Sequence, residues 1–378
     1  MHVLITGGAG FIGSRLSRYM LNLGYEVSVL DSFSTQIHPS GYALPPDIAP
    51  YVRLIIGDIC DRDLVQTSMK NADCLVHFAA ETGTGQSMYE VSRYERTNIS
   101  GTALIYDILA KGGRQKIERI VVASSRSIYG EGAYECNRDG LVYPQTRSVV
   151  DKKSGRFDPV CPVCGGECVS VETPELAPLQ PSSFYGLTKQ VQEQMVLMFG
   201  EVLKIPSTAL RYQNVYGPGQ SLQNPYTGIL AIFSNLARVG RPIQVFEDGL
   251  ESRDFVYIDD VVEATAAACQ IADSSGSEAI NVGAGERITV KQVADRINSF
   301  YGEKSIVTTT GAFREGDIRH GLADLTKARA RLNYEPKVRF ADGLKLFLEW
   351  AGESAPSVQG YERSLLEMEE KGLLHGRV

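Results

Sequence analysis

The chain contains 378 residues, of which 43% are hydrophobic and 22% charged, and it carries a net charge of −7 at pH 7. This composition is typical of a folded globular protein with about two domains. The acidic balance, without a block of lysines and arginines, argues against nucleic acid or an anionic membrane surface as a partner. No apolar run approaches the ~20 residues that a membrane-spanning helix needs.

Cysteine usage and the N-terminus point to a cytoplasmic protein. The seven cysteines are an odd number, and several lie in apolar surroundings such as DCLV and AAAC, where a small buried thiol is the ordinary interpretation. The sequence begins MHVLITGGAG, a strand followed by a glycine turn, so we expect no signal peptide. A secreted disulfide framework is therefore not expected.

Short apolar runs alternate with helical patterns through the first third of the chain. The runs are HVLIT (2–6), EVSVLD (26–31), VRLIIGD (52–58), CLVHFAA (74–80) and RIVVASS (119–125). Helical patterns follow the first glycine turn as far as about Leu23 and recur at about 61–70 and 89–112. This alternation predicts a parallel sheet with helices on both faces, the Rossmann-type, doubly wound α/β fold.

The alternation stops between Arg126 and Ser182, in a segment with scattered proline, glycine and charge and four of the cysteines. A helical pattern resumes at 183–203, a strand follows at 207–215, and the later elements are shorter: helices at about 227–239, 259–272 and 289–300. We therefore expect a Rossmann-type domain over 1–216, with a Cys-bearing insertion at about 131–180. A smaller α/β lobe over 217–378 should interleave with it. An amphipathic tail, YERSLLEMEEKGLL, should dock as a helix.

The motif TGGAGFIG (6–13) indicates a dinucleotide site. Its three glycines follow a strand and open a helix, an arrangement that lets the backbone approach a pyrophosphate at the positive helix end. Asp31 ends the second strand about 20 residues later, where a carboxylate holds the ribose hydroxyls and repels a 2′-phosphate. NAD is thus favoured over NADP. Asp58 in GDI would lie near the adenine, although a helix N-cap before CDRDLV is an equal alternative.

Tyr185 and Lys189 lie four residues apart on a predicted helix and so share one face. An ammonium beside a phenol stabilises the phenolate and lowers its pKa from about 10 toward neutrality, which makes a general base. Ser124 and Ser125 end the fifth strand, at the carboxyl edge where ligands of open α/β sheets bind. A surface pair and a strand-end cap are the ordinary alternatives for these residues.

Taken together, the ordered motifs carry a family resemblance that covers nearly the whole chain. They are TGGAGFIG, Asp31, GDI, HFAAET (77–82), TNISGT (97–102), SSRSIYG (124–130), YGLTK (185–189), LRYQNVYGPGQ (210–220), SRDFVYIDDV (252–261) and REGD (314–317). The chain resembles the extended short-chain dehydrogenase/reductase family, specifically its nucleotide-sugar epimerases and dehydratases. The resemblance implies Tyr185 as the base, Lys189 as its activator and ribose anchor, and Ser125 as the hydroxyl partner. It also implies a homodimer joined through the helices at about 89–112 and 183–203.

The same resemblance assigns the ligand contacts. It implies NAD contacts at Gly7, Gly10, Phe11, Ile12, Gly13, Asp31, Asp58, Ile59, Ala79, Tyr185 and Lys189. It implies nucleotide-sugar contacts at Glu81, Thr82, Ser125, Arg126, Asn214, Arg253 and Arg314. A guanidinium matches a diphosphate bidentately, but a surface salt bridge remains an alternative for the last two arginines. A polar loop without substrate contact remains an equal alternative for Glu81 and Thr82.

The two residues after Ser125 reduce the number of reactions that we expect the site to catalyse. The related 4,6-dehydratases carry an acidic pair there to expel water, and the decarboxylating relatives carry a Glu at the second position, whereas this chain has Arg126 and Ser127. We therefore expect NAD-dependent 4-epimerisation of a nucleotide-hexose through a 4-keto intermediate. The stretches AAETGTGQSMYE and SSRSIYGEGAY, with the Cys-bearing insertion, resemble the dTDP-L-rhamnose 4-epimerase group, which forms dTDP-6-deoxy-L-talose. The alternatives are a UDP-hexose or UDP-N-acetylhexosamine 4-epimerase, an NAD-dependent 4-ketosugar reductase and a non-catalytic NAD-sensing protein.

The stretch VCPVCGGEC (160–168) places three cysteines in nine residues. Cys161 and Cys164 form a knuckle-like pair that can share a structural zinc, with Cys136 and Cys168 as the other candidates and Asp139 as a substitute for Cys168. A reduced, metal-free loop is the equal alternative. A redox role is disfavoured because the pair does not open a helix in a thioredoxin-like unit.

Overall fold

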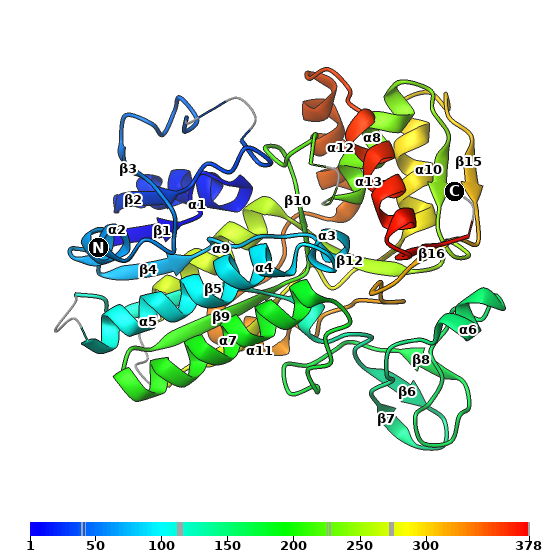
Figure 1. The fold of residues 1–378 in the computed structure, drawn as a ribbon, viewed down its shortest axis with the longest axis horizontal. Coiled ribbons are helices and arrows are strands. Elements are labelled where there is room, and N and C mark those ends of the chain that lie inside the picture. The colour runs from blue at the N-terminus through cyan, green and yellow to red at the C-terminus, as the bar shows by residue number, and fades with distance from the viewer. Residues whose placement is uncertain are drawn as a thin grey trace.

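The computed structural model describes residues 1–38, 41, 43–111, 116–224, 226, 228–271 and 276–376. Its centre is a seven-stranded sheet in the order β13-β9-β5-β4-β1-β2-β3, with every neighbouring pair parallel (Figure 1). The strands are β1 (His2–Thr6), β2 (Glu26–Asp31), β3 (Val52–Ile56), β4 (Cys74–His77), β5 (Arg119–Ser125), β9 (Ser207–Tyr212) and β13 (Glu278–Val282). The predicted Rossmann-type fold is confirmed.

The apolar runs are continuous because helices cover both faces of the sheet. On β1, Val3 and Ile5 pack into one core with Leu16 of α1 (Phe11–Asn22) and Val261 of α9 (Ile258–Cys269). Leu4 points the other way, into a second core. That core is completed by α2 (Arg62–Met69), α5 (Gly101–Lys111) and α7 (Phe184–Leu203). Helices α5 and α7 lie side by side on this face (Figure 1).

The predicted helix at 89–112 is three consecutive segments. These are α4 (Val91–Tyr94), the π-helical turn η1 (Glu95–Ser100) and α5. Within the π turn, the Asn98 side chain is fully buried and accepts a hydrogen bond from the backbone N–H of Glu81. The side-chain bond accompanies a local widening of the helix, a common feature of functional sites. The predicted helix ends at Gly112, Thr227 and Ala272 lie outside the described residues.

The smaller lobe is built from two excursions of the chain. Its helices are α8 (Ile229–Arg238), α10 (Val290–Phe300), α12 (Phe340–Gly352) and α13 (Gln359–Glu370). Short sheets join β10 (Asn214–Tyr216) to β12 (Ser252–Tyr257) and β14 (Arg287–Thr289), β11 (Ile243–Val245) to β15 (Val307–Thr309), and β16 (Phe313–Arg314) to β17 (Leu374–His375). Between the excursions, α9 and β13 return to the large sheet, and α11 (Thr326–Leu332) packs against them.

A strand predicted at 207–215 is divided at Gln213. Residues up to Tyr212 stay in the large sheet as β9, and those from Asn214 form β10, which pairs with β12 in the smaller lobe. One core continues across this division, because Tyr216 packs edge-on against Phe255 and Phe340. The chain thus passes from one lobe to the other without leaving the packed interior.

The Cys-bearing insertion forms a small unit of its own, set apart from the large sheet (Figure 1). It contains an antiparallel sheet in the order β7-β6-β8, from β6 (Tyr134–Cys136), β7 (Gly140–Val142) and β8 (Cys168–Ser170), and the short helix α6 (Val149–Lys153). Within the described part of the chain, no helix combines the length and the apolar character needed to cross a membrane.

Candidate active site

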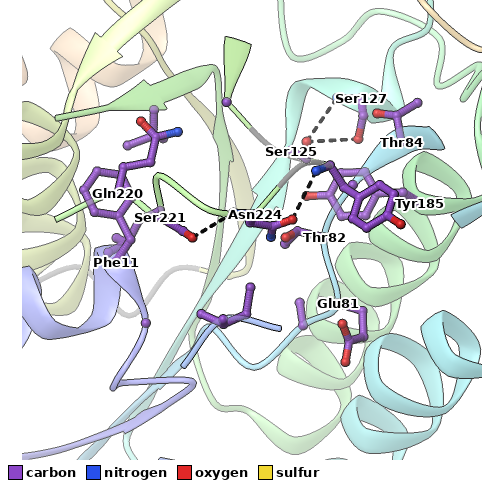
Figure 2. Close-up of a pocket in the computed structure, with 18 of the residues that line it drawn as sticks. Phe11, Glu81, Thr82, Thr84, Ser125, Ser127, Tyr185, Gln220, Ser221 and Asn224 are labelled. Atoms are coloured by element: carbon purple, nitrogen blue, oxygen red, sulfur yellow. Dashed lines mark hydrogen bonds between the residues drawn. The ribbon is translucent and has the colours of Figure 1, made fainter. Parts of the chain in front are cut away.

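A cavity of about 1180 Å³ opens at the carboxyl ends of β1, β2, β4 and β5. Residues of the large sheet line one side, and residues of the smaller lobe, including Arg253, Phe313 and Arg314, line the other. Figure 2 shows Ser125 and Tyr185 on one side of this space and Phe11 and Gln220 on the other. Ligands of open α/β sheets bind at this edge, where strand order reverses between neighbours.

The glycine loop fits a dinucleotide pyrophosphate. Gly7 has φ +67°, and a Cβ there would meet the backbone nitrogen of Ala79 at 2.7 Å, while a Cβ on Gly13 would meet the Cα of Gly8 at 2.5 Å. Gly10 caps α1 without a side-chain hydrogen bond, so the helix end presents its N–H groups to the cavity. Gly7, Gly10, Phe11, Ile12 and Gly13 all line it. A helix end of this kind suits a bound anion such as a pyrophosphate.

Asp31 closes the other end of the cofactor cradle. One carboxylate oxygen accepts the N–H of Ala9 at 3.0 Å, and the other accepts the N–H of Phe33 at 2.8 Å, so the side chain is fixed at the cavity wall. Phe33 holds φ +51°, a left-handed conformation that is costly for an aromatic residue. His38, which sequence reasoning missed, lies 3.9 Å from the carboxylate and lines the same cavity. The fixed negative charge fits the ribose hydroxyls of NAD and opposes a 2′-phosphate.

Asp58, Ile59 and Ala79, the other predicted cofactor contacts, also line the cavity. The alternative reading of Asp58 as a helix cap is wrong, because the N-cap of α2 is Asp61, whose carboxylate accepts the N–H of Leu64. Asp58 instead accepts the N–H of Cys60 at 2.9 Å and pairs with Arg96 at 2.8 Å.

Tyr185 and Lys189 project from the first turns of α7, which begins at a Ser183 cap, and Ser125 ends the neighbouring strand β5. All three line the cavity. Burial raises the pKa of Tyr185, while the hydrogen bond with Ser125 and the positive charge of Arg126 act to lower it. Burial lowers the pKa of Lys189 to about 7, against the attraction of Glu193. A phenol, an ammonium and a hydroxyl in one cavity are groups suited to proton transfer. The hydroxyl of Ser127 donates to that of Ser125 at 2.9 Å.

The sequence analysis did not identify a series of buried, hydrogen-bonded side chains that begins at Lys189. The Lys189 ammonium donates to Gln192, and the Gln192 amide approaches Nε2 of His77 at 3.1 Å. Nδ1 of His77 lies 2.7 Å from the Thr6 hydroxyl. Burial, aided by the charge of Lys189, lowers the pKa of His77 to about 3, so the imidazole is neutral at physiological pH. These hydrogen bonds fix the position of the Lys189 side chain.

A second buried network supports the strand that carries Ser125. The Ser124 hydroxyl donates to Glu193 at 2.5 Å, and Glu193 forms a bidentate pair with Arg211. Arg211 also donates to the Tyr129 hydroxyl at 2.7 Å, and Tyr129 donates to Asn281. Glu193 lies four residues after Lys189 on α7, a spacing that could have drawn attention to it.

The predicted substrate residues Arg126, Asn214, Arg253 and Arg314 meet in the cavity from four separate segments. Arg126 donates to Asn214 at 2.7 Å, and burial together with the charge of Arg253 lowers the pKa of Arg126 to about 9. Arg253 is 8% exposed and donates to the carbonyls of Ile318 and Arg319. The salt-bridge alternative therefore does not describe Arg253.

Arg314 pairs with Asp317 at 2.8 Å and stacks over the ring of Phe246. Both the salt-bridge and the cavity-lining readings of Arg314 hold, since the pair itself lies in the cavity wall. Glu81 and Thr82 line the cavity as well. Glu81 forms an ion pair with Arg93 at 2.8 Å. Asn98 holds this loop through hydrogen bonds with the backbone of Glu81.

The C-terminal helix α13 was predicted to dock, but its place at the cavity was missed. Tyr361, Met368 and Leu373 line the cavity wall. Glu367 accepts hydrogen bonds from Tyr226 at 2.7 Å and Tyr89 at 3.1 Å, joining the tail to both sides of the opening. An amphipathic pattern predicts that a helix packs, but not which surface it covers.

The cysteines of the insertion divide into two groups. Cys136, Cys161 and Cys164 come together with Asp139, and their ligand atoms all lie within 4.8 Å of one another. Cys168, a predicted ligand, is not in that group, and its sulfur donates instead to the carbonyl of Pro159.

Comparisons with known proteins agree with this site. A model of the NAD dependent epimerase/dehydratase family matches residues 3–149 and 161–283. A dTDP-L-rhamnose 4-epimerase from Burkholderia thailandensis is 35% identical over 350 residues, which cover 92% of this chain and 94% of the relative. The structure of a UDP-glucose 4-epimerase from Thermotoga maritima with UDP-glucose matches with a TM-score of 0.74 and 29% identity, over 93% of this chain and 99% of that one.

A second solved structure, a UDP-glucuronic acid 4-epimerase from Bacillus cereus in complex with UDP-glucuronic acid and NAD, matches with a TM-score of 0.75. It is 25% identical and covers 93% of this chain and 99% of that one. The glycine loop, the fixed acidic residue and the Ser–Tyr–Lys group define a dinucleotide-dependent enzyme of the short-chain dehydrogenase/reductase class. More narrowly, the chain belongs to the NAD dependent epimerase/dehydratase family, which confirms the resemblance seen in its motifs.

Proposed function

We propose that this enzyme inverts the C4 centre of a nucleotide-hexose. The observation that carries the proposal is the make-up of the site after Ser125: the Ser125–Tyr185–Lys189 group is intact, and the next two positions hold Arg126 and Ser127 rather than carboxylic acids. A guanidinium bonded to Asn214 is poorly suited to protonating a leaving hydroxyl. The group therefore favours reversible oxidation over loss of water.

The reaction begins at the C4 hydroxyl of the sugar. Tyr185, as phenolate, accepts the hydroxyl proton, and Ser125 orients the same oxygen. NAD, when bound, supplies a hydride acceptor that later returns the hydride, so the cofactor is unchanged over a full cycle. The 4-keto sugar turns about its link to the diphosphate, and Tyr185 returns the proton to the C4 oxygen once the hydride has been delivered to the opposite face.

The arginines of the cavity suit the part of the substrate that does not react. Arg126, Arg253 and Arg314 bring three positive charges to one cavity, and a diphosphate carries the complementary charge. A fixed diphosphate leaves the sugar free to turn, which epimerisation requires.

For the particular sugar we propose dTDP-L-rhamnose, giving dTDP-6-deoxy-L-talose. The support is the 35% identity to a dTDP-L-rhamnose 4-epimerase across nearly the full length of both chains. A UDP-hexose or UDP-N-acetylhexosamine is the alternative substrate class, supported by the fold likeness to UDP-sugar epimerases. A 4-ketosugar reductase is a further alternative, which would show net nicotinamide oxidation.

We also propose that the enzyme is a homodimer joined through η1, α5 and α7. The support is an apolar stripe on the outer face of α7, where Leu187 is 43%, Met198 54% and Val202 66% exposed. Val191 and Met195, on the same face of this helix, are half-buried. A cytoplasmic location is supported by seven free cysteines. A zinc ion in the insertion would have a structural role. The proposed epimerisation does not need it, because Tyr185, Lys189, Ser125 and NAD serve each of its steps.

The test is a Tyr185→Phe variant beside the wild type. After denaturation of the wild type, the released nucleotide is identified, and dTDP-, UDP- and GDP-hexoses are screened by proton NMR for C4 inversion. We expect the variant to lose turnover by at least about a hundredfold while keeping NAD. Stoichiometric NADH accumulation, or release of a stable 4-keto or dehydrated product by the wild type, would overturn epimerisation.

A further inference from the structure

Four potential metal ligands converge in the insertion, away from the catalytic group. The sulfurs of Cys136, Cys161 and Cys164 and a carboxylate oxygen of Asp139 all lie within 4.8 Å of one another. The Cys136 and Cys164 sulfurs are 3.6 Å apart, and Oδ2 of Asp139 lies 3.2 Å from the Cys161 sulfur and 3.4 Å from that of Cys136. Four such groups around one centre match the tetrahedral sites that hold structural zinc.

The four ligands come from two turns with the same spacing. Cys136 and Asp139 are separated by two residues in the turn between β6 and β7, and Cys161 and Cys164 by two residues in the facing turn. Sequence reasoning saw one CxxC pair and lacked the second, because an aspartate occupies the fourth position. The structure supplies that second pair.

Backbone N–H groups in both turns point at the sulfurs. The N–H of Val163 donates to the Cys161 sulfur at 3.4 Å, and the N–H of Gly165 closes the same turn onto the Cys161 carbonyl. In the other turn, the backbone N–H groups of Arg138 and Asp139 face the Cys136 sulfur. N–H donors around a sulfur compensate the charge of a metal-bound thiolate.

The neighbourhood explains why Asp139, rather than Cys168, is the fourth ligand. Cys168 is paired with Cys136 across the β6–β8 ladder, but its sulfur is turned to the Pro159 carbonyl at 3.4 Å. Asp139 already bridges two of the three sulfurs. The cluster therefore has its four oxygen and sulfur ligands without Cys168.

The insertion lacks a core large enough to order it unaided. Its buried apolar cluster consists of Tyr134, Cys136, Val142 and Cys161, with Cys164 and Cys168 packed against it. Two of the four buried members, Cys136 and Cys161, are themselves proposed metal ligands. Small units of this size are usually held by a metal or by disulfides.

The insertion is in turn joined to the substrate side of the cavity by a buried ion network. Arg147, which lies between β7 and α6, is 7% exposed and pairs with Glu131 at 2.9 Å and Glu247 at 2.8 Å. It also donates to the Asp317 carbonyl at 2.9 Å. Glu247 and Asp317 both line the cavity. Asp158, close to the second turn, pairs with Arg319, which also contacts Glu247.

We propose that Cys136, Asp139, Cys161 and Cys164 bind one zinc ion, which holds the insertion folded and so positions the substrate-side wall through Arg147 and Arg319. The zinc site stands whether or not the enzyme is a 4-epimerase. Its metal content can be measured without any substrate.

The primary test is metal analysis and native mass spectrometry of protein prepared without chelators or metal-affinity resin. We expect about one zinc per chain in the wild type, and its loss in Cys164→Ser and Asp139→Ala. Asp139→Cys, which restores a four-cysteine set, should keep the metal, and Cys168→Ser is the matched control that should also keep it. Metal-free wild type with all thiols free would overturn the proposal.

Three further outcomes would also overturn the proposal. Zinc retained by both Cys164→Ser and Asp139→Ala would be an adventitious ion only. A wild-type mass two hydrogens low, with two thiols missing from the titration, would show a disulfide such as Cys136–Cys164 instead. Zinc lost from Cys168→Ser but kept by Asp139→Ala would overturn the ligand set.

Three further measurements use only wild-type protein, so they do not depend on whether the variants fold. Wild type stripped by a chelator and reloaded with Co²⁺ should develop the intense visible bands of tetrahedral cobalt with thiolate charge transfer. Limited proteolysis of the stripped wild type should cut within residues 131–180 before any other region. With the proposed substrate, stripping should raise KM several-fold and change kcat little, and reloading zinc should reverse it. Equal proteolysis of stripped and loaded protein would contradict the structural role.

Discussion

Arg126 and Asn214 are joined across the cavity by a 2.7 Å hydrogen bond from the guanidinium Nε to the amide oxygen. The bond ties the turn after β5 to β10, the first strand of the smaller lobe. Arg126 also lies close enough to Tyr185 for its charge to lower the pKa of the phenol. One residue thus links the catalytic base to the substrate lobe.

Replacing Arg126 by Gln should shift the acid limb of the pH–rate profile upward. The base acts only when deprotonated, so activity rises with pH through the apparent pKa of Tyr185, and removal of a nearby cation raises that pKa. We expect kcat/KM at neutral pH to fall by about ten- to a hundredfold. The pH dependence of kcat/KM for the wild type and the variant measures the shift.

Arg126→Lys is the control for charge. It keeps a cation beside Tyr185 but loses the planar fork that reaches Asn214. The acid limb should therefore stay near its wild-type position while KM rises. An unchanged limb in Arg126→Gln would show that Arg126 does not act on the base.

Asp31→Asn should weaken the discrimination against NADP. The amide can still accept the N–H of Phe33 or Ala9, but it no longer repels a 2′-phosphate. We expect the ratio of NADP to NAD dissociation constants to fall by about tenfold or more. Calorimetric titration of apo protein gives both constants. Asp58→Asn, on an adjacent part of the cavity, should leave the ratio nearly unchanged, and an equal effect at both positions would contradict the assignment.

The buried His77 should make stability fall in mild acid. Its folded-state pKa of about 3 lies below the ordinary 6.5 of an unfolded chain, so the unfolded state binds more protons between these values. The contribution of neutral His77 to the free energy of unfolding is complete above pH 6.5 and is lost as the pH falls toward 3. One such group lowers the free energy of unfolding by about 2 kcal/mol between pH 7 and pH 5.

Urea unfolding at the two pH values tests this in wild type and His77→Gln. The variant should be less stable at both, but its stability should depend less on pH by about that amount. His320, whose pKa burial also lowers to about 3, contributes a separate loss that remains in the variant. An undiminished pH dependence in His77→Gln would refute the prediction.

Tyr361→Ala should weaken substrate binding without removing chemistry. Tyr361 lines the cavity from α13 close to Arg314, one of the proposed diphosphate ligands, so its loss should raise KM about fivefold to tenfold with kcat retained. Steady-state kinetics on the nucleotide-sugar gives both constants. Leu366→Ala on the same helix, where the side chain is 59% exposed, is the matched control and should behave as wild type. A loss of kcat in Tyr361→Ala would place the residue in the chemistry instead.

The sheet and the cofactor half of the site could be predicted because they depend on local pattern. Apolar runs such as HVLIT and the glycine turn carry their meaning within a few residues, and the fold preserves it. Tyr185 and Lys189, four residues apart on α7, both line the cavity. The strand ending at Ser125 was likewise placed correctly, since parallel strands end at one edge of the sheet.

The missed features depend on contacts between distant segments. Glu193 pairs with Arg211, His77 meets Gln192, and Tyr361 reaches the cavity from the tail, and none of these pairings leaves a periodic trace in the sequence. The division of 207–215 was also hidden, because Gln213 interrupts a run that keeps its β-rich composition on both sides. In the insertion, the sequence offered both Cys168 and Asp139 as the fourth ligand, and only the positions of the side chains favour Asp139.

The position of β13 has a consequence for how the enzyme is made. The strand lies at the outer edge of the large sheet beside β9, yet it comes from residues 278–282, after the first excursion into the smaller lobe. During synthesis, the hydrogen-bonding edge of β9 stays unpaired until residue 282 of 378 has left the ribosome. An open edge of this kind is prone to pairing with other chains. The nascent enzyme therefore has a long interval in which chaperone protection matters, and a fragment ending at residue 216 would keep that edge permanently exposed.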